Sequence, residues 1–207
     1  MLGVLNLEGK VGELRSSDLR LLTMLAAPIA VAIENAHLVA RLTAQATRDP
    51  LTGLLNRRGI LAALDAALAR ATPLAPLSVL LVDLNGFKAV NDRHGHAVGD
   101  RLLAALAELL ATNARAGDPV GRLGGDEFLV VLPHADGGHA GAVVRQLAAA
   151  LADEATLPSG VGYSLGLATA TTSEAAVALL ARADRALYEA KRHGDGAVRF
   201  LHSEENV

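Results

Sequence analysis

The chain has 207 residues, of which 51% are hydrophobic and 20% charged, with a formal net charge of −3 at pH 7 and no cysteine. This composition is typical of a globular protein, and it excludes a disordered chain, a disulfide-stabilised scaffold and any site built on a thiolate. The weak negative charge argues against a nucleic-acid partner, and the longest uncharged run near the N-terminus, Leu21–Ile33, is too short to span a bilayer, so we expect a soluble cytoplasmic protein without a membrane partner.

The N-terminal segment predicts a short strand over residues 1–7 and then one long helix. A helix start signal at Ser16 or Ser17 precedes an apolar run, and the helical pattern continues to about Ala46. Apolar residues recur at helical spacing at Leu22, Leu25, Ile29, Ile33, Ala36 and Ala40. Pro28 lies inside this helix and is expected to kink it. Because a single helix cannot bury such a stripe, we expect it to pair with a copy of itself.

From Thr47 onward the pattern predicts an α/β domain, in which strands alternate with helices around one hairpin. The expected helices span about Arg58–Ala71, Val98–Asn113, Gly138–Ala152 and Ser173–His193. The expected strands are Leu77–Leu84, Asp118–Leu123, Glu127–Pro133, Gly160–Ala170 and Ala197–His202. The strand Leu77–Leu84 is almost entirely apolar, which is typical of a central strand buried on both faces. Residues 85–100 are polar and are interpreted as a loop leading into the next helix.

Three carboxylates are expected at one edge of this sheet. Asp83 lies at the end of the apolar strand, and Asp126 and Glu127 follow Gly124 and Gly125 at the hairpin turn. If the two strands are neighbours, the carboxylates repel one another unless a cation intervenes, and hard oxygen ligands suit Mg²⁺. The glycines would let backbone N–H groups approach a phosphate. The alternative is a solvated turn, because Gly and Asp are common in turns; Asp83 favours a functional site.

Five motifs in order carry a resemblance to a known family. The pentapeptide Gly-Gly-Asp-Glu-Phe at residues 124–128 is joined by DPLTGLLNRR (49–58), VDLNGFKAVNDRHGHAVGD (82–100), YSLGLA (163–168) and ADRALYEAK (183–191). From Thr47 to about Leu201 the sequence resembles the GGDEF family of diguanylate cyclases. Residues 1–46 resemble the last strand and final helix of a GAF sensor domain, followed by a signalling and dimerisation helix. Most of such a sensor is missing, which suggests a piece of a longer protein.

The resemblance implies a palm-like, nucleotidyl-cyclase-like sheet with flanking helices over residues 47–207, preceded by the long helix. It also implies the condensation of two GTP molecules into cyclic di-GMP and two pyrophosphates by a homodimer. Asp83 and Asp126 would be ligands of Mg²⁺, or of Mn²⁺, assisted by the carbonyl of Leu84 and the carboxylate of Glu127. Asp126 or Glu127 would help to deprotonate the attacking 3′-hydroxyl.

Further positions match the family's nucleotide-binding residues. Asn91 and Asp100 correspond to the pair that binds the guanine edge. Phe87, Lys88 and Lys191 correspond to the residues that bind the phosphates. Arg115 and Asp118 match the family's Arg-x-x-Asp site, at which the product inhibits synthesis; the alternative is an ordinary charged helix end. Asp195 stands where the family usually has an arginine, which predicts weaker GTP binding.

A second function stays open alongside the enzyme. Degenerate members of the family bind GTP or cyclic di-GMP as non-catalytic receptors, but the retained acids Asp83, Asp126 and Glu127 favour catalysis. A purely structural dimerisation module is disfavoured by the retained guanine pair. Elsewhere, Asp49 is interpreted as the structural partner of Arg57 or Arg58, and Arg122 as a charge at a strand edge.

Overall fold

The computed structural model describes residues 16–152, 161–171, 173–193 and 198–203. The chain divides into two compact units, Met1–Ala46 and Thr47–Val207. The strand expected over residues 1–7 lies outside the described residues. In the part of the chain that is described, no helix combines the length and the apolar character needed to cross a membrane.

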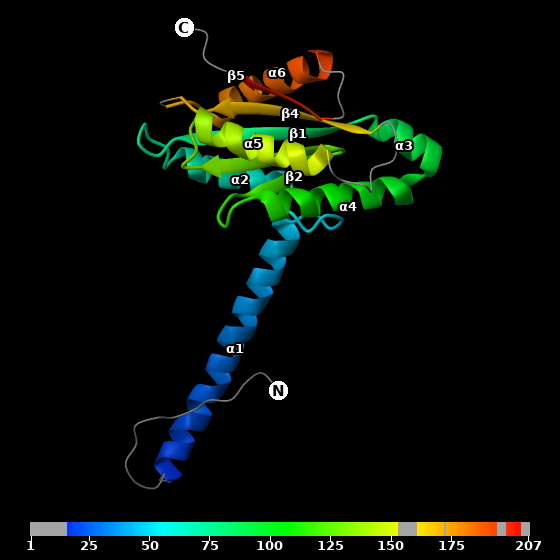
Figure 1. Ribbon diagram of the computed structural model, residues 1–207. Helices are drawn as coiled ribbons and strands as arrows, with labels where there is room; N and C mark the ends of the chain where they lie inside the picture. Colours follow the sequence, from blue (N-terminus) through cyan, green and yellow to red (C-terminus); the bar gives the residue numbers. More distant parts are fainter. Residues whose placement is uncertain (1–15, 153–160, 172, 194–197, 204–207) are drawn as a thin grey trace. The chain divides into compact units, whose positions relative to one another are not determined.

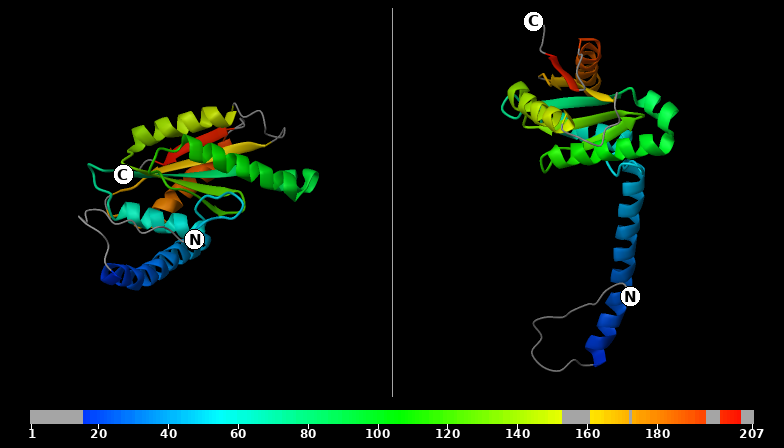
Figure 2. Two further views of the ribbon diagram at one scale, coloured as in Figure 1. Left: turned by 90° about the horizontal axis from the view of Figure 1, so that it is seen from below. Right: turned by 45° about the vertical axis from the view of Figure 1, so that its right-hand side comes forward.

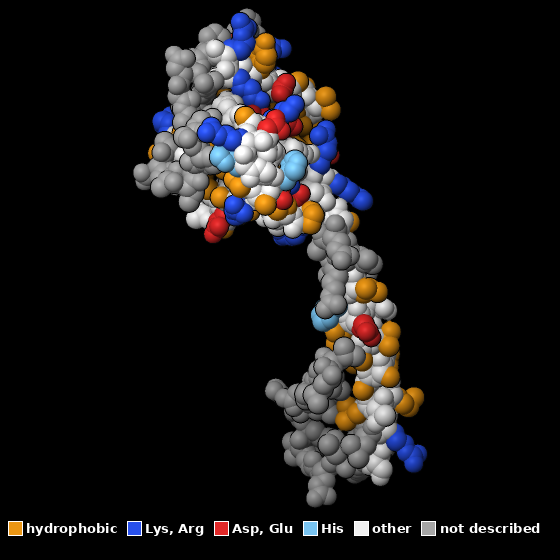
Figure 3. Space-filling view, turned by 90° about the vertical axis from the view of Figure 1, so that its right-hand side faces the viewer, with side chains coloured by type: hydrophobic (Ala, Val, Ile, Leu, Met, Phe, Trp, Pro, Cys, Tyr) orange, Lys and Arg blue, Asp and Glu red, His pale blue; other side chains and the backbone are white. Residues whose placement is uncertain are grey.

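The N-terminal unit contains the helix α1, Ser16–Thr47, which includes Ser16, Ser17 and Pro28 (Figure 1). Between residues 22 and 38, where its side chains are described, the apolar side chains are largely exposed, and Figure 3 shows hydrophobic side chains along the helix. The exposed fractions are 75% at Met24, 47% at Leu25 and 42% at Ile33. Contiguous exposed apolar surface is unusual in a monomer, so this helix has the properties of an interaction surface.

The second unit is a five-stranded sheet with helices on both faces (Figures 1 and 2). The helices are α2 (Arg57–Leu68), α3 (Phe87–His94), α4 (His96–Asn113), α5 (Gly137–Ala152) and α6 (Ala176–His193). The strands are β1 (Leu77–Asn85), β2 (Val120–Gly124), β3 (Glu127–Pro133), β4 (Gly162–Thr169) and β5 (Val198–Ser203), in the spatial order β2-β3-β1-β4-β5. The pairs among β2, β3, β1 and β4 are antiparallel, and β5 joins β4 in parallel. The predicted α/β class is thus confirmed.

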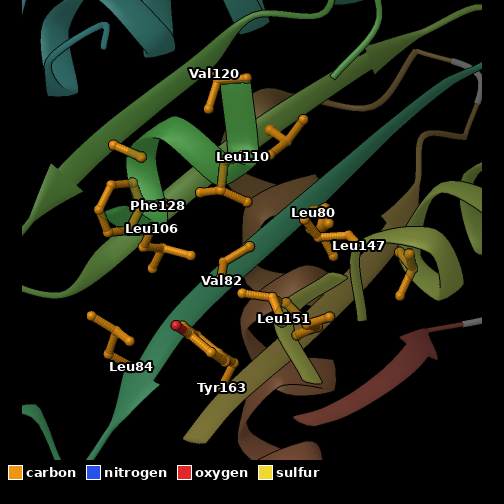
Figure 4. Packing of buried hydrophobic residues seen from close by; sticks show 14 of the residues in the cluster. Leu80, Val82, Leu84, Leu106, Leu110, Val120, Phe128, Leu147, Leu151 and Tyr163 are labelled. Carbon is orange, nitrogen blue, oxygen red and sulfur yellow. The ribbon is translucent and has the colours of Figure 1, made fainter. Parts of the chain in front are cut away.

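β1 is the central strand and is buried on both faces, as its apolar run predicts. Successive side chains of a strand point to opposite faces. Leu80, Val82 and Leu84 therefore pack in a core under α4 and α5, and Figure 4 shows side chains of those helices gathered around Val82. Val79 and Leu81 pack in a second core with α2 and α6. Burial of each large apolar side chain contributes about 1.5–3 kcal/mol, so β1 is firmly anchored.

The prediction of a loop over residues 85–100 is wrong. This segment forms the two-turn helix α3 and the first turn of α4. Two glycines bound α3, Gly86 with φ of 78° and Gly95 with φ of 80°, which are left-handed conformations that favour glycine. Val90 is buried in the core, and the charged residues and the histidine of α3 are exposed, whereas Asn91 is partly buried. The polar composition of the segment predicted a loop, because α3 has only one buried residue, Val90, to indicate a helix.

Candidate active site

The hairpin between β2 and β3 turns tightly at Gly125 and Asp126, with Gly124 opposite Glu127. Gly124 has a φ of 148° and Gly125 a φ of 54°, which are positive values that a residue with a Cβ rarely adopts. A Cβ built on either glycine meets no other atom within 4 Å, so the turn is open on the outside. Two adjacent glycines therefore produce a turn whose backbone a ligand can approach closely, with Asp126 half-buried beside it.

Asp83 lies near the end of β1, where its Cα is in register with that of Glu127 on β3. The expectation that the two strands are neighbours is confirmed. The residue is only 6% exposed, and its Oδ2 lies 2.8 Å from Nζ of Lys191 on α6. Burial raises the pKa of Asp83, the Lys191 ammonium lowers it, and the nearby charge of Asp126 raises it again. The structure thus brings Asp83, Asp126 and Lys191 into one electrostatic cluster.

The third acid lies at the rim of this cluster. Glu127 is exposed and lines a groove of about 350 Å³ together with Asp184, Tyr188 and Lys191. Among the described residues, no three His, Asp or Glu side chains lie close enough together to hold a metal by themselves. Mg²⁺ usually takes only one or two carboxylates and completes its shell with water and substrate phosphates. Asp83 and Asp126 fit that donor set.

The side chain of Leu84 is 1% exposed and packs in the core under α4 and α5, so it is not available to a ligand. The role predicted for the Leu84 carbonyl stays a prediction.

Asn91 on α3 has a buried amide oxygen that no donor of the described structure satisfies. Gly99, in the first turn of α4, lies against this amide, and a Cβ at that position would overlap Asn91 Oδ1 and contact the ring of Phe87. A buried acceptor without a donor costs about 1–3 kcal/mol, so it indicates a place for a ligand's N–H group. Asp100, the predicted companion of Asn91, is exposed on α4, and Lys88 is exposed on α3.

The sequence profile described as the diguanylate cyclase GGDEF domain matches residues 46–197. The chain belongs to the GGDEF family. Its matched region includes the acid cluster, the glycine turn and Asn91.

Relatives and solved structures of the GGDEF domain agree with this assignment. The chain is 39% identical over 161 residues to the response regulator PleD of Caulobacter vibrioides, covering 74% of this chain and 36% of PleD. It is 36% identical over 165 residues to the diguanylate cyclase DgcS of Shewanella oneidensis, covering 77% and 54%. The coiled coil and GGDEF domain of DgcB from Caulobacter crescentus, solved with c-di-GMP, matches at a TM-score of 0.77 and 25% identity, covering 86% and 98%. The chain spans about half or less of the length of these two curated relatives.

Arg122 on β2 is a residue of the GGDEF domain whose importance the sequence did not reveal. Its Nε and Nη2 donate to the carbonyl of Gly125, at 3.0 and 2.7 Å, and its Nη1 lies 3.3 Å from both carboxylate oxygens of Asp49. The interpretation of Asp49 as the partner of Arg57 or Arg58 is wrong, as is that of Arg122 as a mere edge charge. The guanidinium instead joins the turn after α1 to the β2–β3 hairpin.

Asp49 is itself held by the turn in which it lies. Thr52 donates to Asp49 Oδ1 from its backbone N–H at 2.9 Å and from its hydroxyl at 2.7 Å. Burial would raise the pKa of Asp49, but the bonds from Thr52 and the charge of Arg122 outweigh it and lower the pKa. The same turn continues to Leu55, which exchanges backbone hydrogen bonds with β2: its N–H with Val120 and its carbonyl with Arg122. The turn is therefore fastened to the hairpin strand.

Arg115 and Asp118 form a tight turn between α4 and β2. The N–H of Arg115 donates to Asp118 Oδ2, and the N–H of Asp118 donates to the carbonyl of Arg115, both at 3.0 Å. Burial raises the pKa of Asp118, whereas the Arg115 N–H and charge lower it, with a net rise. The Arg115 side chain is exposed. The turn thus fixes the Asp118 carboxylate and leaves the Arg115 guanidinium in solvent. Asp195, the predicted departure from the family, lies outside the described residues.

Proposed function

We propose that this GGDEF domain condenses two GTP molecules into cyclic di-GMP with release of two pyrophosphates. The observation that carries the proposal is the cluster at the end of β1, where Asp83, nearly buried, interacts electrostatically with Asp126 of the glycine turn. In each half-reaction a 3′-oxygen forms a bond to an α-phosphorus while the bond to the β-phosphate bridging oxygen breaks. The hydroxyl proton goes to Asp126 or Glu127, and pyrophosphate leaves.

Asp83 and Asp126, with the carbonyl of Leu84 and the carboxylate of Glu127, are the residues that would hold Mg²⁺, or Mn²⁺ in its place. When bound, the ion would neutralise the charge of the triphosphate and of the leaving pyrophosphate. The cluster would orient the phosphate oxygens, because β1, which carries Asp83, is packed on both faces.

The base and phosphates would be bound on either side of the acids. Asn91, whose Oδ1 is buried without a donor, would accept from the guanine edge together with Asp100. Such a pair rejects adenine because the wrong base leaves the buried acceptor unpaired. Phe87, Lys88 and Lys191, with the N–H groups of Gly124 and Gly125, would serve the phosphate end.

A second copy of the chain would complete the reaction, because each GGDEF domain supplies one GTP. The exposed apolar side chains of α1 support a homodimer formed through this helix, and α1 would carry the signal from a preceding GAF sensor. We expect the rate per subunit to rise with protein concentration. Rates strictly proportional to enzyme, at concentrations where sedimentation shows a monomer, would contradict the dimer.

Arg115 and Asp118 would bind the product and inhibit synthesis. A guanidinium can bind a phosphate or the Hoogsteen edge of guanine in a bidentate manner, and a carboxylate accepts from the base N–H groups. The exposed Arg115 side chain beside an anchored carboxylate supports this assignment.

Incubation of the full chain with GTP and Mg²⁺, followed by chromatography of the products, tests the proposal. We expect cyclic di-GMP from the wild type and a loss of at least about a hundredfold in kcat for Asp126→Ala, because that acid acts at the reacting phosphate. Asp65→Ala, which removes an exposed acid on α2, is the matched control and should retain activity. A folded wild-type protein that binds GTP or cyclic di-GMP without turnover would identify a non-catalytic receptor instead.

A further inference from the structure

Lys191 occupies an unexpected position in the site. The sequence assigns it to the phosphate end, yet its Nζ lies 2.8 Å from Oδ2 of Asp83, the acid assigned to the metal. The Asp83 side chain is 9% exposed and the Lys191 side chain 39%. A half-exposed ammonium is thus paired directly with an almost buried carboxylate.

An ammonium and a divalent cation compete for the same carboxylate oxygen. Two cations at about 4 Å repel each other appreciably even at an effective dielectric constant of about 20, and the repulsion doubles when one of them is divalent. With Lys191 in this position, a divalent cation at Asp83 must displace the ammonium or accept that repulsion. The ion pair therefore lowers the affinity of the site for a cation that arrives alone.

The Lys191 side chain is suited to an exchange of anionic partners. It extends from α6 on a flexible four-carbon stem and is partly solvated, whereas the helix behind it is anchored by the buried Leu187 and Ala190. A triphosphate that arrives with the cation brings new anionic oxygens to which the ammonium can move. Lys191 then loses one anionic partner and gains another, which is not possible with the cation alone.

We propose that Lys191 is a resident counter-ion of Asp83 that transfers to the nucleotide phosphates when cation and nucleotide bind together. The role of the nucleotide in this proposal rests on the proposed function, whereas the ion pair between Lys191 and Asp83 is observed in the structure. Lys191 would then pair first with Asp83 and afterwards with the nucleotide phosphates. The binding of the cation and the binding of the nucleotide would therefore depend on each other. The site is thereby kept from filling with a cation in the absence of GTP.

The test is a calorimetric titration of the full chain with MnCl₂ in the absence of nucleotide. Lys191→Met should bind Mn²⁺ about tenfold more tightly than the wild type, because the competing ammonium is gone. The same variant should bind a GTP analogue with a methylene between its α- and β-phosphorus about tenfold more weakly in the presence of Mn²⁺, because one phosphate partner is lost. Opposite shifts in one variant cannot arise from a general loss of structure.

Matched variants separate the ion pair from other effects of charge. Arg192→Met removes a neighbouring cation whose guanidinium lies over the Tyr188 ring, and it should leave the Mn²⁺ affinity unchanged. Lys191→Arg keeps the charge and should keep the weak Mn²⁺ binding, whereas Lys191→Gln should behave as Lys191→Met. Addition of Asp83→Asn to Lys191→Met should remove the gain.

Equal or weaker Mn²⁺ binding by both Lys191→Met and Lys191→Gln would overturn the proposal, and so would a gain that survives Asp83→Asn. Turnover of GTP by the wild type is measured in parallel. Turnover without the Mn²⁺ gain would refute the counter-ion role alone. The Mn²⁺ gain without turnover would refute the cyclase assignment and leave the counter-ion role of Lys191 standing.

Discussion

Replacement of Arg122 by lysine should slow catalysis much more than it destabilises the domain. The guanidinium uses Nε and Nη2 on the Gly125 carbonyl and Nη1 on the Asp49 carboxylate. One lysine ammonium cannot occupy the places of three nitrogens in a planar fork. Because the peptide group is planar and trans, fixing the Gly125 carbonyl also fixes the N–H of Asp126 in the same peptide. We therefore expect Arg122 to position the glycine turn that carries Asp126.

The magnitude follows from the bonds that are lost. A hydrogen bond from a charged donor contributes about 1.5–3 kcal/mol, but the Gly125 carbonyl is exposed and regains water. We expect Arg122→Lys to lower the free energy of unfolding by about 1 kcal/mol and Arg122→Ala by about 2 kcal/mol. Misplacement of a catalytic group by about 1 Å costs on the order of a hundredfold in rate. The kcat of Arg122→Lys should thus fall by about 10- to 100-fold, with little change in KM.

The assay is steady-state formation of cyclic di-GMP, with urea unfolding of the same preparations. Arg58→Lys, an exposed arginine on α2, is the control for a change of side-chain type and should match the wild type in both measurements. If folded Arg122→Lys has a kcat within about twofold of the wild type, the Gly125 carbonyl does not need the guanidinium fork and the reasoning fails.

The interactions of the Asp49 carboxylate predict that the stability of the domain depends on pH. The folded-state pKa of Asp49 lies below the ordinary value of 3.8, because burial, which would raise it, is outweighed by the hydrogen bonds from Thr52 and the charge of Arg122, so the ionised carboxylate stabilises the domain above that value. The stabilisation is lost as the pH falls through the lower folded-state pKa. Asp49→Asn should therefore be less stable than the wild type at neutral pH, and the difference should shrink below about pH 3.8 in urea unfolding measured across this range. A difference that grows with acidity would contradict this sign.

Three other substitutions test the nucleotide and product sites. Gly99→Ala should raise the KM for GTP by about tenfold or more, because a Cβ there displaces the Asn91 amide; an unchanged KM would show that Asn91 does not bind the base. Arg115→Ala should weaken cyclic di-GMP binding by calorimetry by about tenfold, and equal affinity in both proteins would remove the site. Asp195→Arg should lower the KM for GTP several-fold, roughly 1 kcal/mol, with a smaller change in kcat; an unchanged or higher KM would mean that Asp195 points away from the nucleotide.

The sequence alone was sufficient for the elements whose signals are local. The uninterrupted apolar run of β1 predicted a strand buried on both faces, since only a central strand can place every side chain in a core. The glycine pair predicted a tight turn with acids at its tip, because positive φ values there favour glycine. The helix α3 escaped prediction because its polar outer face outweighs its single buried residue, Val90.

Only the tertiary structure decided which charges are partners. Asp49 had arginines nearby in sequence, at positions 57 and 58, yet it pairs with Arg122 on β2; Asp83 pairs with Lys191 on the last helix. Composition and spacing do not show which cation pairs with a given aspartate, because every arginine and lysine carries the same positive charge. The Asp49 pair depends on the bridge that fastens its turn to β2, and the Asp83 pair depends on the packing of α6 against β1. Contacts between residues so far apart in the chain arise only when the sheet assembles, and for that reason local sequence carries no signal for them.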